Sequence, residues 1–157
     1  MINFFKISII INLFHFSLFG HCQIPCGIYS DAMQIIQIKE DLRTIEKSIT
    51  MIKKLSEKSD ALSINQNNRW ITSKEKHAQN IQDIISQYFL TQRIKPSSQN
   101  YENKLITLHQ LLVSVMKCKQ SVNNENVKKS NELLDDFTEY YFDEHDLEHI
   151  KDFEHIN

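Results

Sequence analysis

Three side chains near the start of the chain could together hold a transition metal. They lie within residues 21–29, called the hook below, which read His-Cys-Gln-Ile-Pro-Cys-Gly-Ile-Tyr, and they are His21, Cys22 and Cys26. Proline fixes φ and glycine allows positive φ. We therefore expect Pro25 and Gly27 to turn the chain back and to bring the Cys26 sulfur toward Cys22.

The hook follows a segment with the pattern of a secretory signal peptide. Residues 1–20 carry one charged side chain, Lys6, and then an apolar run over residues 7–19 that four polar residues interrupt. Such a run is too short and too interrupted for a membrane-spanning helix. We expect cleavage after Gly20, export to the periplasm or secretion, and no stable membrane span in the product, whose free amino terminus would be His21.

Cleavage before His21 would create a distinctive set of donor atoms. The free His21 amine, the deprotonated Cys22 amide nitrogen and the Cys22 thiolate would form two fused five-membered chelate rings, and the Cys26 thiolate can complete the set. Two nitrogens and two sulfurs held nearly coplanar favour a square-planar divalent ion, nickel or copper, over tetrahedral zinc. The His21 imidazole can reach an axial position, so a redox-active metal is expected.

The cysteines also have an interpretation without metal. Two cysteines in an exported protein often form a disulfide, and the chain would then be an exported helical interaction protein whose Cys22–Cys26 disulfide staples its amino terminus. The third cysteine, Cys118, lies in an apolar helical stretch. We expect Cys118 to be a buried free thiol.

Length and charge indicate one domain and no nucleic-acid partner. Of the 157 residues, 137 remain after removal of residues 1–20, which suits a single core over residues 21–157. These 137 residues carry 17 basic and 20 acidic side chains, a formal charge of −3 with neutral histidines. Neither the net charge nor the scattered lysines give the basic patch that nucleic-acid binding requires.

Apolar residues recur at helical spacing in four stretches. These are Ile35, Ile38, Leu42, Ile45, Ile49 and Ile52; Trp70, His77, Ile81, Ile84 and Tyr88; Tyr101, Leu105, Leu108, Leu112 and Val115; and Val127, Leu134, Phe137 and Tyr141. Polar connections are expected over residues 56–68, after Pro96 and at residues 123–126. The pattern predicts an all-α fold, an antiparallel four-helix bundle over about residues 30–142 that carries the hook at its amino terminus.

Four details complete the expected architecture. Ser30 is the expected N-cap of the first helix, and Asp31 in the first turn suits the helix dipole. His77 is expected to be a hydrogen-bonded core histidine, with a role in or beside a metal site as the alternative. In the acidic tail, residues 143–157, His145 and His149 are spaced for a second metal site, but a solvated, frayed end is the expectation.

The sequence His-Cys-x-x-Pro-Cys-Gly-x-Tyr directly after a removable leader resembles the hook of nickel superoxide dismutases. The resemblance extends to stretches similar to the marine branch of that family, which are Arg69-Trp70-Ile71-Thr72, Gln87-Tyr88-Phe89 and Thr91-Gln92-Arg93-Ile94-Lys95. It implies conversion of superoxide to dioxygen and hydrogen peroxide by Ni(II)/Ni(III) cycling, one nickel ion per subunit, and a homohexamer. The alternative to export is then a cytoplasmic protein whose leader is removed by a dedicated processing peptidase.

The resemblance also implies roles for individual residues. His21, Cys22 and Cys26 would bind nickel, with the His21 imidazole axial in the oxidised state. Tyr29 matches the family tyrosine that stands over the open face of the nickel and orders water and small anions. Tyr88 matches the second tyrosine of the site.

Departures from the family concern the partner of the axial imidazole. Gln37 occupies the place where some members carry a glutamate that holds this imidazole, and Glu40 follows one turn later. An amide is a weaker acceptor than a carboxylate. Near the place of the family arginine in this network lie Lys76 and His77.

Overall fold

The structure is a computed structural model, and it describes residues 30–143 and 147. The leader, the hook, and both His145 and His149 lie outside the described residues. Within the described part the chain forms helices and no strand. The elements are α2 (Asp31–Ser56), α3 (Ala61–Asp83), the π-helix η1 (Ile84–Arg93), α4 (Tyr101–Gln120) and α5 (Asn124–Tyr141).

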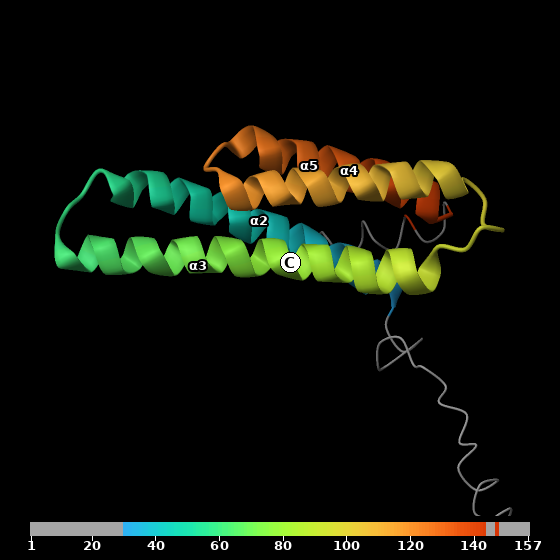
Figure 1. The fold of residues 1–157 in the computed structure, drawn as a ribbon, viewed down its shortest axis with the longest axis horizontal. Helices are drawn as coiled ribbons and strands as arrows, with labels where there is room; N and C mark the ends of the chain where they lie inside the picture. The colour runs from blue at the N-terminus through green and yellow to red at the C-terminus, as the bar shows by residue number, and fades with distance from the viewer. Residues whose placement is uncertain (1–29, 144–146, 148–157) are drawn as a thin grey trace, which may run out of the picture.

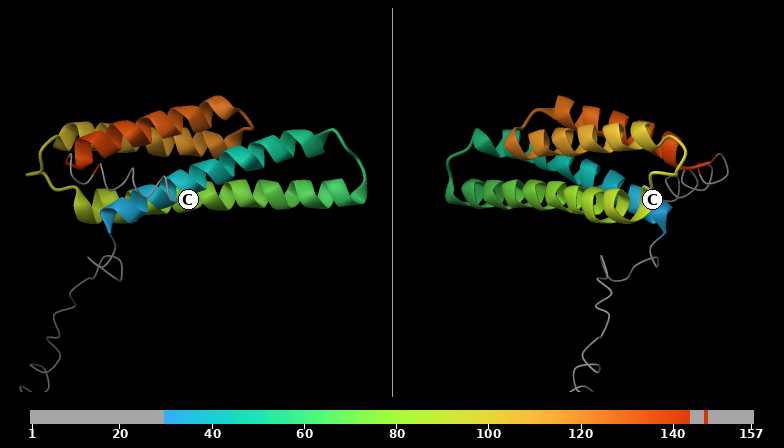
Figure 2. Two further views of the ribbon diagram at one scale, coloured as in Figure 1. Left: turned by 180° about the vertical axis from the view of Figure 1, so that it is seen from behind. Right: turned by 45° about the vertical axis from the view of Figure 1, so that its right-hand side comes forward.

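The helices form two antiparallel hairpins that pack on each other. The α2 helix runs beside α3 in one hairpin, and α4 runs beside α5 in the other, as the views in Figures 1 and 2 agree. The η1 segment continues α3, so the described chain has four helical rods with alternating direction. The predicted all-α antiparallel four-helix bundle is confirmed. None of the described helices has the length and apolarity that a membrane crossing needs.

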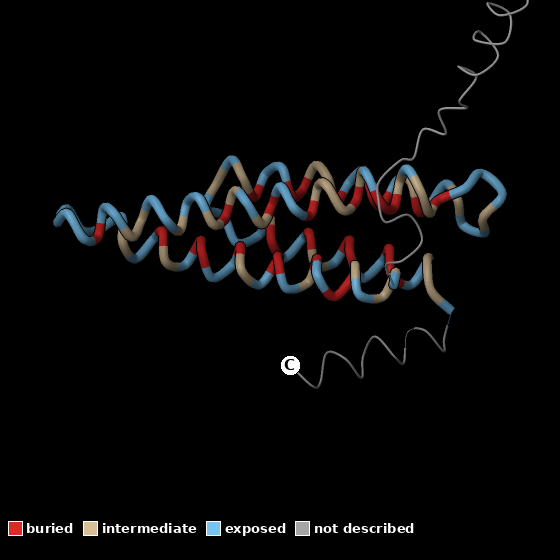
Figure 3. Tube along the Cα trace, turned by 90° about the horizontal axis from the view of Figure 1, so that it is seen from below, coloured by how far each residue is buried: buried red, intermediate tan, exposed pale blue. Residues whose placement is uncertain are grey.

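The core lies between the two hairpins, where the buried stretches of each helix face inward (Figure 3). All six residues of the first predicted seam are buried, from Ile35 at 0% exposure to Ile52 at 7%. In α4 the fully buried residues include Leu111 and Cys118, which the predicted seam omitted, while Leu105 and Leu112 pack at the edge. Helical spacing therefore predicted the buried face of the first rod fully. The buried face of the third rod is rotated slightly from the predicted one.

The second rod differs from the prediction in its start and in its buried face. It begins at Ala61, inside the expected connection, because the Asp60 side chain caps it by accepting a hydrogen bond from the Ser63 backbone nitrogen at 3.0 Å. The inward face is formed by Lys74, Ala78, Ile81, Ile85 and Phe89. Trp70, predicted on this face, is only half-buried. Because residue 74 is a lysine, the spacing of apolar residues did not indicate which face of this rod is buried.

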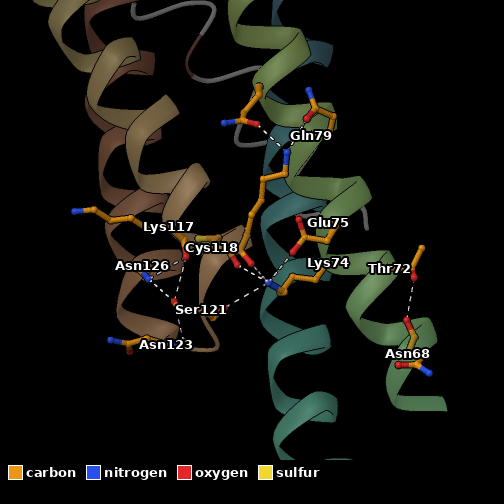
Figure 4. Close-up of polar contacts among 12 residues, drawn as sticks. Asn68, Thr72, Lys74, Glu75, Gln79, Lys117, Cys118, Ser121, Asn123 and Asn126 are labelled. Carbon is orange, nitrogen blue, oxygen red and sulfur yellow. Dashed lines mark hydrogen bonds and ion pairs between the residues drawn. The ribbon is translucent and has the colours of Figure 1, made fainter. Parts of the chain in front are cut away.

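The α2–α3 hairpin extends beyond the end of α4 (Figure 1). Lys74 lies at the level at which α4 stops (Figure 4). The Lys74 ammonium is buried and donates to the carbonyl oxygens of Cys118 at 2.9 Å, Lys119 at 2.5 Å and Ser121 at 3.5 Å. It also lies 3.0 Å from Glu75 Oε1. The last carbonyls of a helix have no intrahelical donor, so Lys74 caps the carboxyl end of α4.

Lys74→Met is expected to lower the free energy of unfolding by about 2 kcal/mol, because hydrogen bonds to a charged group are strong and their loss leaves buried carbonyls without a donor. Urea unfolding followed by circular dichroism measures the change. Lys76→Met, at an exposed position of the same helix, is the matched control and should change stability by less than about 0.5 kcal/mol. Equal unfolding midpoints for the two variants would contradict the capping role.

Candidate active site

Tyr88 is the one predicted site residue that lies in the described part of the chain. His21, Cys22, Cys26 and Tyr29 lie outside the described residues. The α2 helix begins at Asp31, two residues after the hook ends. Its amino-terminal end is therefore where the described bundle joins the hook.

The Asp31 carboxylate accepts hydrogen bonds from three side chains at this end of the bundle. The Tyr88 hydroxyl and Arg93 Nε both donate to Oδ1, the latter at 2.8 Å. The Tyr141 hydroxyl donates to Oδ2 at 2.6 Å. Arg93 also donates to the Tyr88 hydroxyl oxygen, from Nε at 3.1 Å and from Nη2 at 2.9 Å. We call Asp31, Tyr88, Arg93 and Tyr141 the Asp31 cluster.

The π-helical geometry of η1 brings Tyr88 and Arg93 together. In an α-helix, residues five apart are separated by roughly 140° around the axis. A π-helix is hydrogen-bonded from residue i to i+5, so residues five apart lie nearly above one another. The Arg93 guanidinium carbon accordingly lies 5.0 Å from the centroid of the Tyr88 ring. Such segments are rare and occur frequently at functional sites.

Both phenols of the cluster hold their protons at neutral pH. Burial first, and then the hydrogen bond to Asp31, raise the pKa of Tyr88 to about 12, while the hydrogen bond from Arg93 opposes the shift. Burial and then Asp31 likewise raise the pKa of Tyr141 far above its usual range. Both hydroxyls are therefore hydrogen-bond donors to Asp31 under ordinary conditions.

The cluster predicts a loss of stability in alkali. Because the pKa of Tyr88 is higher in the folded protein than the value of about 10 in an unfolded chain, the stabilisation is complete below pH about 10. It is lost as the pH rises toward about 12. Urea unfolding as a function of pH should show this loss in the natural protein and in the control Tyr140→Phe, and a smaller loss in Tyr88→Phe. An identical decline in both variants would contradict it.

A second polar group lies further along α2, around Asp41. This carboxylate is 1% exposed, and its Oδ1 lies 2.6 Å from His77 Nδ1 and 3.5 Å from Gln37 Nε2. Asn80 donates to Oδ2 at 2.6 Å. Gln37 and Glu40, the two candidates for the partner of the His21 imidazole, are both exposed.

The prediction that His77 is a core residue is wrong, although its hydrogen bonding is confirmed. Its side chain is 32% exposed and, with Gln37, Asp41 and Lys76, it lines a pocket of about 460 Å³. The buried member of the pair is Asp41, which the sequence interpretation missed. The signal was present, because Asp41 lies three residues after Ile38 and four before Ile45, and therefore on the apolar seam.

Cys118 is a buried free thiol, as predicted. It is 0% exposed, its Sγ lies 3.9 Å from Ser130 Oγ, and burial raises the pKa of the thiol. Within residues 30–143, no group of three histidine, cysteine, aspartate or glutamate side chains is arranged to hold a metal ion. The hook, and His145 with His149 in the tail, lie outside the residues to which this finding applies.

Comparison with protein families agrees with the hook and the helical bundle. A family model described as nickel-containing superoxide dismutase matches residues 17–145, which include the hook, the Asp31 cluster and all four helical rods. A search of curated proteins and a search of solved structures each found no significant match. The family model covers most of the chain. The chain therefore belongs to the nickel-containing superoxide dismutase family and is an oxidoreductase that converts superoxide with nickel as its cofactor.

Proposed function

We propose that the processed amino terminus binds one nickel ion per subunit. The His21 amine, the Cys22 amide nitrogen and thiolate, the Cys26 thiolate and the His21 imidazole would hold the ion. The range of the family match, which includes all three residues, supports this proposal. The donor set also fits nickel, because thiolates and an amidate donate electron density to the ion and lower its potential. Cys118 does not compete, since burial keeps its thiol protonated.

In this proposal the metal supplies the redox chemistry, and the side chains around it orient the substrate. When bound, nickel supplies the redox chemistry by alternating between its divalent and trivalent states, while two superoxide anions and two protons become dioxygen and hydrogen peroxide. Tyr29 orders water and small anions at the open face. Tyr88 adds a second phenol; its hydrogen bond to Asp31, two residues from the hook, is the observation that carries this placement.

Tyr88 acts as a hydrogen-bonding group and not as the acid that supplies protons. With a pKa of about 12, its hydroxyl is too weak an acid to release a proton at neutral pH. In this proposal the two protons consumed in peroxide formation come from the bulk solvent. This division assigns orientation to Tyr88 and anion ordering to Tyr29.

Nickel content and the amino-terminal residue of the purified protein test the proposal. We expect one nickel per chain, His21 as the first residue, and superoxide decay that is lost on chelation and restored by nickel. The competing interpretation, a helical interaction protein with a Cys22–Cys26 disulfide, expects no nickel and a mass lower by two hydrogens. A nickel-free protein with that disulfide and no activity would overturn our proposal.

We propose export on the basis of Lys6 and the apolar run that follows it. Cell fractionation combined with activity measurement tests this assignment. Active enzyme found only in the cytoplasm would instead indicate a dedicated peptidase that removes the leader there.

We also propose a homohexamer of the marine branch. A nine-residue hook has little core of its own and needs neighbouring bundles to seat it. Exposed apolar side chains support an association surface, among them Leu62 at 69%, Ile64 at 51% and Ile106 at 56% exposure. Sedimentation should give a hexamer, and a stable, fully active monomer would contradict the proposal. The branch assignment rests on the stretches 69–72, 87–89 and 91–95.

A further inference from the structure

We infer that Asp31, Arg93 and Tyr141 are positioning residues of the dismutase site, which fix the Tyr88 phenol and the first turn of α2 where the hook joins the bundle. The inference rests on the proposed placement of Tyr88 beside the nickel. It goes beyond that placement because it gives three further residues, from α2, η1 and α5, a shared role in the reaction.

The hydrogen bonds of Asp31 exceed what a helix start requires. A first-turn carboxylate can interact favourably with the helix dipole while its oxygens face water. Asp31 instead has a side chain only 24% exposed and accepts from one guanidinium and two phenols. Hydrogen bonds to a carboxylate are about twice as strong as neutral ones. Asp31 therefore ties the start of α2 to both η1 and α5.

Arg93 reaches the cluster through an uncommon backbone conformation. Only the π-helical form of η1 places it over Tyr88, as described above. Its guanidinium then covers the ring face at 5.0 Å and donates to the hydroxyl oxygen. The Tyr88 hydroxyl donates to Asp31 and accepts from Arg93, so its orientation is fixed by two groups of opposite charge.

The packing contacts of Tyr141 are made by its ring and do not require its hydroxyl. The Tyr141 ring lies 5.4 Å from the ring of Phe89, 5.2 Å from that of Phe137 and 4.9 Å from that of Phe142, measured between centroids. The ammonium of Lys104, from α4, lies 5.1 Å from the same ring. Phenylalanine would keep these contacts, whereas the hydroxyl reaches Asp31 Oδ2. Its role is to hold the carboxylate.

Tyr141→Phe provides the cleanest test, and Tyr140→Phe, an exposed neighbour on the same helix, is its matched control. Both are measured as cleaved, nickel-loaded enzyme. We expect both variants to hold as much nickel as the natural protein. Tyr141→Phe should lower kcat/KM for superoxide roughly tenfold, the loss of one hydrogen bond to a charged group, and Tyr140→Phe should not. Equal kcat/KM in the two variants would overturn the inference.

Asp31→Asn adds a second measurement, the pH–rate profile, which a purely structural role of Asp31 would leave unchanged. Among the residues that the structure describes, the charged groups in contact with Tyr88 or Tyr141 are Asp31 from α2, Arg93 from η1 and Lys104 from α4. Removing the one negative charge among them lowers the pKa of Tyr88. The alkaline limb of the pH–rate profile should therefore move to lower pH in Asp31→Asn. It should stay in place in the control Asp135→Asn, a carboxylate that is 62% exposed and paired with Lys39.

Failure of the inference and failure of the proposed function look different. If the natural protein binds no nickel and is inactive, the proposed function itself is wrong. If it is active, but Tyr141→Phe and Asp31→Asn match their controls in kcat/KM and in pH profile, the cluster is structural and the inference is wrong. Should Asp31→Asn fail to fold, Tyr141→Phe decides alone.

Discussion

A chain that keeps residues 1–20 is expected to bind almost no nickel and to show almost no superoxide dismutase activity. A single extra residue before His21 should have nearly the same effect. Extension converts the His21 amine, a good neutral donor, into an amide that must lose a proton before it can bind a metal. The added chain also occupies the space through which the imidazole must reach the metal. Nickel content and superoxide decay measure the effect.

The control for this experiment places the same residue at the other end of the chain. A protein cleaved before His21 and extended by one residue after Asn157 should bind nickel and react like the natural protein. Full activity in the uncleaved chain would falsify the amine as a ligand. Loss of activity in both extended proteins would show that the defect is not specific to the amino terminus.

Cys22→Ser and Cys26→Ser are each expected to reduce superoxide dismutase activity to background. A serine hydroxyl does not ionise near neutral pH and is a poor electron donor, whereas thiolate is the soft ligand that makes trivalent nickel accessible. Nickel content and superoxide decay of each variant provide the measurement. Tyr29→Phe should be milder, because nickel stays bound while the ordering of anions weakens.

Cys118→Ala is the matched control for the cysteine variants. The Cys118 side chain is 0% exposed and packs in the core. Its removal should lower stability by about 1 kcal/mol through loss of packing and leave nickel content and rate unchanged. A Cys26→Ser protein that retained full nickel and activity, or a Cys118→Ala protein that lost its nickel, would contradict the ligand assignment.

The sequence was informative wherever the relevant contacts are local. The seam from Ile35 to Ile52 is a short-range pattern, since helical spacing alone decides which face is buried, and the structure buries all six residues. The hook is also local, because the proposed donor atoms follow one another along the backbone. No knowledge of the bundle was needed to propose that set.

The Asp31 cluster was not predictable in the same way. Tyr88 and Arg93 lie on different faces of an ordinary α-helix, and only the π-helical widening of η1 unites them. Tyr141 is 110 residues from the carboxylate to which it donates, so its role depends on how the hairpins pack. The role of Lys74 was not predictable for a related reason, because its partners are backbone carbonyls at the carboxyl end of α4, far from it in the sequence. Long-range polar contacts leave little trace in residue spacing.

The unequal length of the two hairpins has a consequence for amide hydrogen exchange. Ahead of Lys74, Ser63 is the only buried residue of α3, so this end of the helix has few apolar contacts to resist local opening. In a dissociated subunit, amides over residues 61–73 should exchange through fraying, whereas those around Tyr88, beside fully buried Phe89, should exchange only when the whole bundle unfolds. Exchange over residues 61–73 would therefore report fraying alone. A change at the hook, which joins the bundle at its opposite end, would be visible only in the slowly exchanging amides of that end.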